Sequence, residues 1–380
     1  MIATSNGREL AGGGFELDII FMPEYRVRHS PVVVAEEALP QAMVSTTSTV
    51  FDTSVAVLVL KVGSYPLHRG RLGIARSMGR VGVPVFGVYE DRFTPGAVSK
   101  YVRGRVVWKN EDVSAEAFLE GLDDIARHLK RQTVLVPTDD HGAILIAERG
   151  RSLDERFVFP VQPTSLPRTL ASKEGLYRTC REFGVPCPEA FFPTTRADVE
   201  EFVSWAAFPV VVKAIRAWDL RGHSTRSTAI VDSPESLLGM VASEIGNPSP
   251  GVMLQEYIPR EQGEDWFYHG YCNEDSECLV SFTGIKLRSY PAHAGPTTFG
   301  RSVENVALRT QAEELFRALN YRGIMGLDYR FDLRDGQYKL LDFNPRIGAQ
   351  FRLFETEAGV DVMRALRLEM TGHKVPQRVP

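Results

Sequence analysis

The residues best suited to chemistry lie in a segment near the C-terminus, GLDYRFDLRDGQYKLLDFNPRIG, which spans 326–348. Two alternating strands flank the tripeptide RDG at 334–336. A three-residue hairpin loop with glycine last is a favoured connection, because that position takes a positive φ. In this register Asp328 lies directly opposite Asp342. Strand alternation then places Asn344 on the same face as Asp342.

Two opposed carboxylates on one sheet face repel each other unless a cation lies between them. Carboxylate and amide oxygens without imidazole or thiolate suit Mg²⁺, which usually shares its coordination shell with phosphate. Asp328, Asp342 and Asn344 therefore predict a metal–phosphate platform, and Arg346 adds a fixed positive charge beside it. The alternative interpretation is an ordinary exposed hairpin with charges on its solvated face.

The composition is that of a globular chain of 380 residues, 43% hydrophobic and 24% charged, long enough for two or three domains. A net charge of −4 and a pI near 6.1 exclude binding to nucleic acid or an anionic membrane by bulk electrostatics. An anionic ligand must therefore be held by a few well-placed cations. No apolar run approaches the roughly 20 residues of a membrane span. The N-terminus lacks the pattern of a secretory signal, so a cytoplasmic protein is expected.

The four cysteines, Cys180, Cys187, Cys272 and Cys278, form no C-x-x-C pair. A chain of this size has little need of disulfides. Free thiols in a reducing cytoplasm are therefore expected in preference to a zinc site or a disulfide.

From residue 55 onward, apolar β runs alternate with helical patterns, which indicates a parallel sheet covered on both faces. The glycines after the first strand do not fit the G-x-G-x-x-G dinucleotide pattern, which argues against a dehydrogenase. At 137–141, PTDDH follows a strand at the edge where ligands usually lie. Helix capping is the favoured interpretation there and substrate contact the alternative. Strands are expected over 55–60, 84–89, 105–108 and 133–137, and helices over 69–82 and 115–130.

The flanking segments give weaker signals. Residues 1–52 contain two short apolar runs, at 15–22 and 31–36, and are interpreted as an extension that packs on the body or takes part in self-association. A homodimer is left open. A proline-interrupted linker over 160–167 predicts a domain boundary. It precedes a helix over 172–183 closed by glycine, and strands over 210–213 and 252–257.

The order of these motifs resembles the ATP-grasp superfamily: a strand ending in lysine, a strand ending in EYIP, a further acid, and DFNPR. More narrowly, it resembles the predicted carboxylate–amine ligases that include D-aspartate ligase, over roughly residues 55–370. The resemblance implies an α/β N-terminal domain with a parallel sheet, followed by two α+β subdomains that form an ATP-grasp clamp. The implied division is 1–52 (extension of unknown role), 53–160 (N-terminal domain), 161–255 (first subdomain) and 256–380 (second subdomain with the metal site).

The resemblance also assigns nucleotide contacts. Lys173 and Lys213 match the lysines that contact phosphate in the family. A buried lysine that ends an apolar strand is costly without an anionic partner, although Lys213 can also extend its ammonium to water. Glu264 matches the acid that binds ribose, because a carboxylate can accept from both hydroxyls. The segment whose backbone would read the adenine edge comprises Gln255, Glu256, Tyr257 and Ile258.

Two further regions match parts of the family's catalytic site. Lys286 and Arg288 alternate along one predicted strand, where a basic residue reaches the phosphates. The loop over 291–302 is rich in small residues and resembles the region near the substrate carboxylate. Its candidate substrate contacts are Thr297, Thr298, Arg301 and Ser302.

Two features depart from the family pattern. The phosphate-covering loop, which begins at Arg216, has a single glycine, whereas the family's loop is usually glycine-rich. Both metal acids are aspartate, whereas many relatives use glutamate, and the shorter side chain alters the reach to a metal.

The expected activity is an ADP-forming, ATP-dependent ligase that joins a carboxylic acid to an amine through an acylphosphate. Its cofactors are ATP and Mg²⁺, with Mn²⁺ as a substitute, and its partners are small molecules. Lys286, Arg288 and Arg346 would neutralise charge at the reacting groups. The alternatives are an ATP-grasp kinase, an acid–thiol ligase, and a non-catalytic nucleotide-binding protein. The glycine-poor loop favours the last of these, whereas the acid–acid–Asn–Arg set argues against it.

Overall fold

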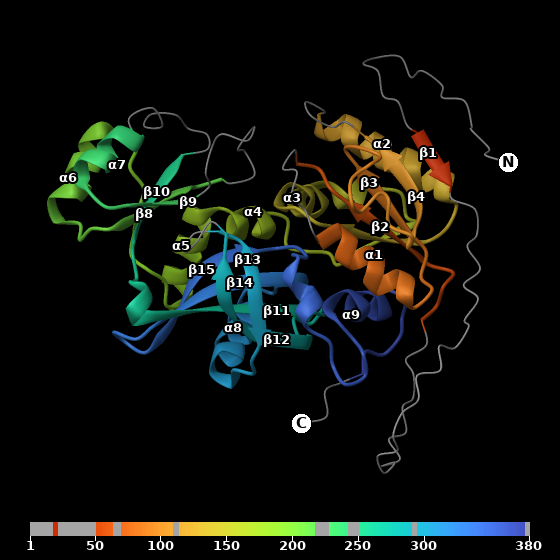
Figure 1. Cartoon of the computed structure of the whole chain (residues 1–380). Helices are drawn as coiled ribbons and strands as arrows, with labels where there is room; N and C mark the ends of the chain where they lie inside the picture. The colour runs from red at the N-terminus through yellow and green to blue at the C-terminus, as the bar shows by residue number, and fades with distance from the viewer. Residues whose placement is uncertain are drawn as a thin grey trace, which may run out of the picture.

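A computed structural model describes residues 18–21, 51–63, 70–108, 114–216, 228–241, 251–290 and 295–376. These ranges form three sheets with helices packed on them. In Figure 1 the six-stranded sheet lies at the right, the four-stranded sheet at the left, and the five-stranded sheet between and below them. The candidate site residues come mainly from the five-stranded sheet. The other two sheets contribute single residues that lie beside it.

The six-stranded sheet has the order β1-β4-β3-β2-β5-β6. Its last five strands are parallel, which confirms the predicted α/β domain. The first strand pairs antiparallel with β4, so part of the N-terminal extension packs on the body as expected. The second apolar run, at 31–36, lies outside the described residues. The strands are β1 (Asp18–Phe21), β2 (Ala56–Leu60), β3 (Val85–Tyr89), β4 (Val102–Val107), β5 (Thr133–Pro137) and β6 (Phe157–Val158).

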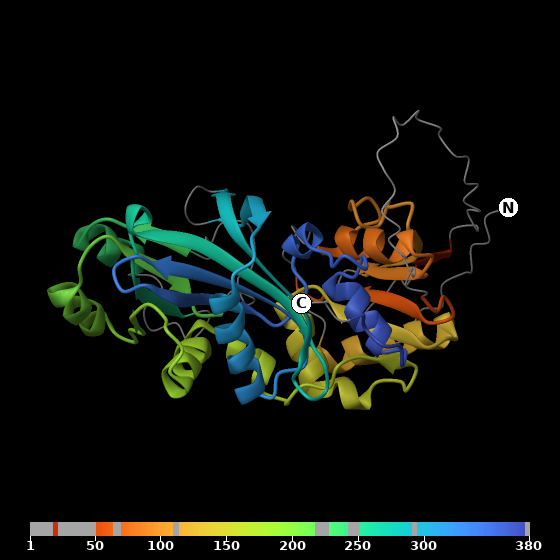
Figure 2. The same ribbon diagram turned by 90° about the horizontal axis from the view of Figure 1, so that it is seen from below.

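Both faces of this sheet are covered because β2 buries alternate residues on opposite sides. Val57 and Val59 pack with α1 (Gly70–Arg80) and α9 (Val362–Glu369), which lie side by side (Figure 2). Ala56, Leu58 and Leu60 pack with α2 (Ala115–Leu129) on the other face. The α1–α9 core also includes residues of the five-stranded sheet and of the chain that follows it. The six-stranded and five-stranded sheets therefore share one hydrophobic core.

The four-stranded sheet is antiparallel, with the order β7-β10-β8-β9. Helices α6 (Arg196–Trp205) and α7 (Pro234–Val241) pack on it and build a core of their own. Because that core takes its residues from this sheet and its two helices, the sheet forms a separately packed unit. Its strands are β7 (Ala190–Phe191), β8 (Val210–Ala214), β9 (Thr228–Val231) and β10 (Val252–Glu256).

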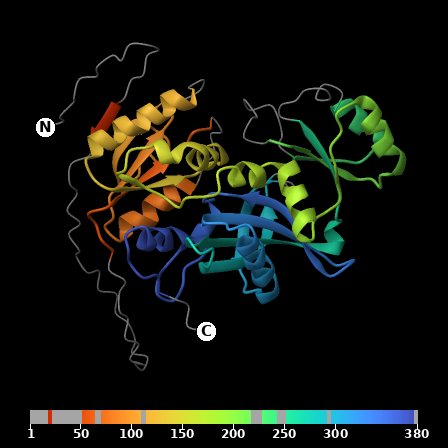
Figure 3. The same ribbon diagram turned by 180° about the vertical axis from the view of Figure 1, so that it is seen from behind.

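The five-stranded antiparallel sheet has the order β13-β12-β11-β14-β15. Three helices, α4, α5 and α8, contribute to its core. Helices α4 and α5 lie between the other two sheets (Figure 3), although in sequence they precede the four-stranded sheet. The elements are α4 (Leu166–Ala171), α5 (Lys173–Phe183), β11 (Gly263–Cys272), β12 (Cys278–Ser289), β13 (Thr297–Ser302), α8 (Val306–Ala318), β14 (Gly323–Asp332) and β15 (Gln337–Asn344). The remaining helices are α3 (Asp140–Arg149) and the 3-10 helices η1 (Gly150–Ser152), η3 (Arg260–Gln262) and η4 (Gln350–Leu353).

The hairpin that joins β14 to β15 confirms one prediction and corrects another. Asp328 does lie opposite Asp342. The loop, however, has four residues, 333–336, rather than three, with Gly336 at φ 71°. A four-residue loop alone would offset the pairing by one residue. A β-bulge at Leu341 restores the register, because Tyr329 pairs with Leu340 while Asp328 pairs with Asp342.

The expectation of four free thiols is wrong for two of them. Cys272 and Cys278 form a disulfide with a Cα–Cα distance of 4.0 Å. They are direct partners at the turn end of the β11–β12 hairpin, so strand pairing brings together two cysteines that share no sequence motif. Cys180 and Cys187 are free. Among the described helices, none combines the length and the apolar character needed to cross a lipid bilayer.

Two glycines inside helices provide a matched test of this packing. In α2, a Cβ at Gly121 would overlap the Trp108 indole, so Gly121→Ala should lower the free energy of unfolding by about 1–3 kcal/mol. In α7, Gly239 is exposed with nothing within 4 Å of that position, so Gly239→Ala should raise it by about 0.5–1 kcal/mol. Thermal unfolding followed by circular dichroism measures both. Equal melting of Gly121→Ala and the wild type would contradict this packing.

Candidate functional site

The two opposed aspartates are each paired with a lysine from another element. Asp342 on β15 lies 2.5 Å from the Nζ of Lys173, the first residue of α5. Asp328 on β14 lies 3.4 Å from the Nζ of Lys286 on β12, which reaches across the intervening β11. The repulsion expected between two opposed carboxylates is therefore offset by ammonium groups.

The oxygens of this platform fit a divalent cation. Oδ1 of Asp328 is a buried acceptor without a hydrogen bond. The Asn344 amide is fixed at both ends, since its Nδ2 donates to the Gly326 carbonyl (3.2 Å) and its Oδ1 accepts from Arg346 (2.8 Å). Among the described residues, no group of three or more His, Cys, Asp or Glu could hold a metal ion. A metal held by two carboxylates and an amide needs further oxygens, and phosphate supplies them for Mg²⁺.

The charges of the platform shape the pKa values around it. Burial tends to raise the pKa of Asp342, but Lys173 and the other nearby cations outweigh it and lower that pKa. Asp342 is therefore ionised. The charge of Asp328 raises the pKa of Lys286 above its ordinary value, although burial opposes this shift.

Lys213 brings the four-stranded sheet to the same place. It lies on β8, half-buried, and has no ion-pair partner within 4 Å in the described part of the chain. Loss of hydration, together with the nearby charge of Lys173, lowers its pKa to about 8, although Asp342 and Asp328 oppose the shift. A half-buried ammonium without a partner beside two lysines is suited to an anion.

Arg346 ties the platform to the six-stranded sheet. Its Nε donates to Oδ1 of Asp140 at 3.0 Å, while its Nη2 donates to Asn344. Asp140 is the first residue of α3 and belongs to the PTDDH segment. The preceding Asp139 caps α3 by accepting from the Gly142 N–H (3.1 Å), which confirms the capping interpretation for that residue. Asp140, in contrast, accepts the hydrogen bond from Arg346.

The predicted adenine segment is held by hydrogen bonds to the β14–β15 hairpin and to the chain just before β7. Glu256 accepts from Arg334 at the tip of the β14–β15 hairpin (2.5 Å), and its N–H donates to the Glu189 carbonyl (2.9 Å). The carbonyl of Ile258 accepts from Arg330 (3.2 Å). These contacts connect the end of β10 to the strand that carries Asp328.

The other residues predicted to contact the nucleotide differ in solvent exposure. Gln255 is buried within β10, and Tyr257 is half-buried just after it. Glu264 is exposed near the start of β11 and accepts from the Trp266 indole N–H (3.1 Å). An exposed carboxylate at that position remains open to a ribose.

The substrate candidates lie on the outer edge of the five-stranded sheet. A bulge at Leu287 separates Lys286 from Arg288, which is exposed and donates to Thr298 Oγ1 on β13 (3.3 Å). Arg301 and Ser302 are exposed on the same edge strand. Part of the predicted substrate loop, 291–294, and the glycine-poor loop over 217–227 lie outside the described residues.

A buried series of hydrogen-bonded side chains next to Asp328 was not predicted from the sequence. His269 on β11 is 3% exposed, and burial lowers its pKa to about 4, so the imidazole is neutral. Its Nε2 lies 2.9 Å from Oε1 of Gln350, whose Nε2 donates to Thr297 Oγ1 (2.6 Å). Gly326 leaves room for the imidazole, since a Cβ there would lie 2.9 Å from the ring. A histidine within an apolar strand gives no sequence signal that separates this role from core packing.

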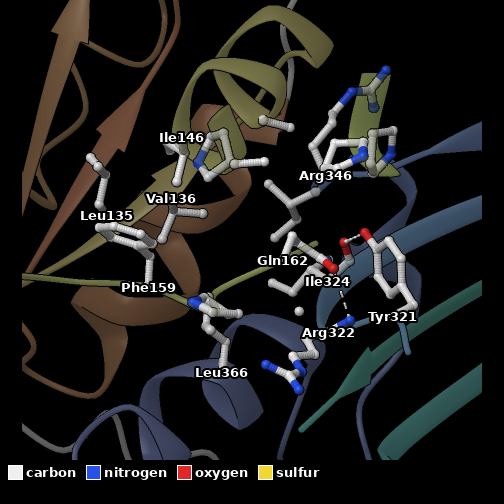
Figure 4. A pocket seen from close by; sticks show the side chains of 18 residues that line it. Leu135, Val136, Ile146, Phe159, Gln162, Tyr321, Arg322, Ile324, Arg346 and Leu366 are labelled. Atoms are coloured by element: carbon white, nitrogen blue, oxygen red, sulfur yellow. Dashed lines mark hydrogen bonds between the residues drawn. The ribbon is translucent and has the colours of Figure 1, made fainter. Parts of the chain in front are cut away.

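A cavity of about 60 Å³ lies beside Arg346 (Figure 4). Its lining is mostly apolar and comes from β5, α3, the 159–167 linker, β14 and α9. Two hydrogen bonds border it, from the Tyr321 hydroxyl to the Ile324 carbonyl and from the Arg322 N–H to Gln162. The cavity includes neither aspartate of the platform, so it is a gap at the junction of the sheets rather than the phosphate site.

The comparisons with known proteins agree with this geometry. No family model matches the sequence. Among solved structures, the biotin carboxylase domain of *Hydrogenobacter thermophilus* 2-oxoglutarate carboxylase, in complex with MgADP, ADP and bicarbonate, has a TM-score of 0.61 and 13% identity, over 85% of this chain and 71% of that one. The L-amino acid ligase of *Bacillus licheniformis* has a TM-score of 0.60 and 15% identity, over 85% and 75%. The fold of this chain is therefore the ATP-grasp fold, as predicted.

A relative by sequence narrows the resemblance. D-aspartate ligase of *Enterococcus faecium* is 24% identical over 309 residues, which span 77% of this chain and 72% of the ligase. This similarity supports the predicted likeness to the carboxylate–amine ligases of the ATP-grasp superfamily. It also supports an ATP-dependent ligase activity.

The depressed pKa of Lys213 predicts proton uptake when nucleotide binds. With a pKa of about 8, roughly half of the Lys213 side chains are neutral at pH 8, and contact with phosphate restores the charge. Binding of ATP at pH 8 should therefore take up about half a proton, and affinity should weaken as the pH rises through 8. Calorimetry in two buffers of different ionisation enthalpy measures the uptake. In Lys213→Arg, which stays charged, both effects should disappear, and equal uptake by the two proteins would contradict the assignment.

Proposed function

We propose that this chain is an ADP-forming, ATP-dependent ligase that joins a carboxylate to an amine through an acylphosphate. The observation that carries the proposal is the opposed pair Asp328 and Asp342, each held by a lysine, beside the Asn344–Arg346 contact. A protein that only binds adenine has no use for opposed carboxylates. The acid is an amino acid or another small carboxylic acid, because the ligases that resemble this chain are named for amino acids.

Each group of site residues has a separate role in this reaction. Asp328, Asp342 and Asn344 would hold Mg²⁺, which neutralises charge on the transferring phosphoryl group. Lys173, Lys213 and Lys286 supply ammonium groups to the phosphate oxygens. A carboxylate oxygen of the acid attacks the γ-phosphorus and ADP leaves. The amine nitrogen then attacks the acyl carbon, phosphate leaves, and the nitrogen loses a proton.

Arg346 would orient the acid. Because Asp140 and Asn344 hold two of its nitrogens, the guanidinium is fixed in direction, and its Nη1 has no hydrogen-bond partner in the described part of the chain. A fixed guanidinium is well suited to a carboxylate. Catalysis of this kind depends on positioning and charge neutralisation rather than on a protein nucleophile.

Several finer expectations belong to the same proposal. The adenine would lie against 255–258 and the ribose against Glu264, while Arg288, Thr298, Arg301 and Ser302 would border the substrates. Mn²⁺ can replace Mg²⁺ because both accept oxygen ligands. The four-part division of the chain, a cytoplasmic location with access to ATP, and self-association as a homodimer complete it. The biotin carboxylase domain reported above is itself described as a dimer.

Release of phosphate tests this function directly. Mg·ATP is incubated with pools of amino acids of both hands and small carboxylic acids, with and without amines. Release should require both an acid and an amine, and the other product should be an amide. A stable phosphorylated product would indicate a kinase, whereas thiol-dependent release would indicate an acid–thiol ligase.

The variant that tests the role of Asp342 in this assay is Asp342→Asn, which removes one carboxylate and keeps the shape of the side chain. Turnover should fall by at least about 10²–10³-fold in protein that keeps the wild-type circular dichroism spectrum, whereas thermal stability should decrease because Lys173 loses its partner. Full activity in this variant would contradict the role given to Asp342. ATP binding without phosphate release under any condition would favour a non-catalytic nucleotide-binding protein.

A further inference from the structure

In the structure, each proposed metal ligand already has a cation beside it. Lys173 lies on Asp342, Lys286 lies near Asp328, and Arg346 donates to the oxygen of Asn344. These cations come from α5, β12 and the segment after β15. The charge of the platform is thus balanced by side chains of the protein itself.

A free divalent cation has little to gain from this arrangement. To reach the carboxylates it must displace the ammonium groups of Lys173 and Lys286, whose side chains are only 11% and 17% exposed. Each displaced ammonium would remain largely buried without an anionic partner, which is strongly unfavourable. Lys213, nearby and already unpaired, adds a further positive charge to the same region.

A nucleotide changes this balance because its phosphates are new partners for the displaced ammonium groups. Lysine is suited to such an exchange, since its charge sits on a flexible stem of four carbons. One end of each lysine is meanwhile fixed. The Lys173 backbone N–H donates to the Ile215 carbonyl (3.0 Å), and Lys286 lies within a paired strand. The ammonium groups can therefore move from carboxylate to phosphate without movement of the backbone.

We propose that Lys173 and Lys286 act as internal counter-ions that keep the aspartate platform closed to free divalent cations until nucleotide phosphates draw them away. This inference rests on the proposed function, because it takes the platform to be the metal site of the nucleotide. It adds that the two lysines, beyond contacting phosphate, make metal binding depend on nucleotide binding. The platform is then specific for a metal–nucleotide complex rather than for the metal alone.

The test measures binding of Mn²⁺ by electron paramagnetic resonance of the free ion, without catalysis. Wild-type protein should bind Mn²⁺ weakly alone and at least about tenfold more tightly with a non-hydrolysable ATP analogue, after the Mn²⁺ complex that the analogue forms without protein has been subtracted. Lys286→Met and Lys173→Met should each bind Mn²⁺ without nucleotide about tenfold or more tightly than the wild type. The matched control is Lys339→Met, which removes a lysine paired with Asp332 (2.7 Å) in the same hairpin. It should leave Mn²⁺ binding unchanged.

The outcomes separate this inference from the proposed function. Tight binding of Mn²⁺ to the wild type without nucleotide would overturn the inference while leaving the metal platform in place. Failure of both methionine variants to gain Mn²⁺ affinity, with nucleotide-dependent binding intact in the wild type, would also overturn it. Failure of the wild type to bind Mn²⁺ even with the analogue would overturn the platform, and with it the proposed function.

Discussion

The opposition of two carboxylates on one face of the β14–β15 hairpin is the constraint on which the rest of the site depends. Asp328 and Asp342 are direct partners, and such a pair is unfavourable unless positive charge compensates it. The protein brings that charge from three separate elements, as Lys173 from α5, Lys286 from β12 and Lys213 from β8. Sheet and helix packing around the hairpin are therefore arranged to deliver cations to one place.

The three sheets contribute unequally to this arrangement. The six-stranded and five-stranded sheets share a core, and the Arg346–Asp140 ion pair joins them at the end of the platform. The four-stranded sheet has its own core and, among the described residues, brings Lys213 and the end of β10 to the site. Phosphates that contact Lys213 and the aspartate platform together would connect the two packed units. Binding energy from the nucleotide is then available to close the site.

Much of this was accessible from the sequence because it depends on local patterns. Strand alternation and a glycine with positive φ predicted the hairpin, and a start–stop pattern closed by Gly184 and Pro186 predicted α5. The Asp328–Asp342 pairing was predicted correctly although the loop length was not, since the bulge at Leu341 compensates for the extra loop residue. Bulges depend on tertiary packing and have no reliable sequence signal.

The contacts that escaped prediction join residues far apart in the chain. Asp140 and Arg346 are 206 positions apart, and His269 and Gln350 are 81 apart, so neither pair leaves a local pattern. The Cys272–Cys278 disulfide was missed for a different reason. Cysteine spacing and the reducing compartment favoured free thiols, whereas the two residues form a disulfide because they face each other across a hairpin.

The central claim is that the aspartate pair is where metal and phosphate meet, and the Mg²⁺ dependence of nucleotide binding tests it most directly. Calorimetric titration of a non-hydrolysable ATP analogue, with and without Mg²⁺, compares the wild type with Asp328→Asn. The account predicts that Mg²⁺ tightens binding to the wild type by about tenfold or more and has little effect on the variant. An Asp328→Asn variant that keeps the full Mg²⁺ dependence of the wild type would contradict it.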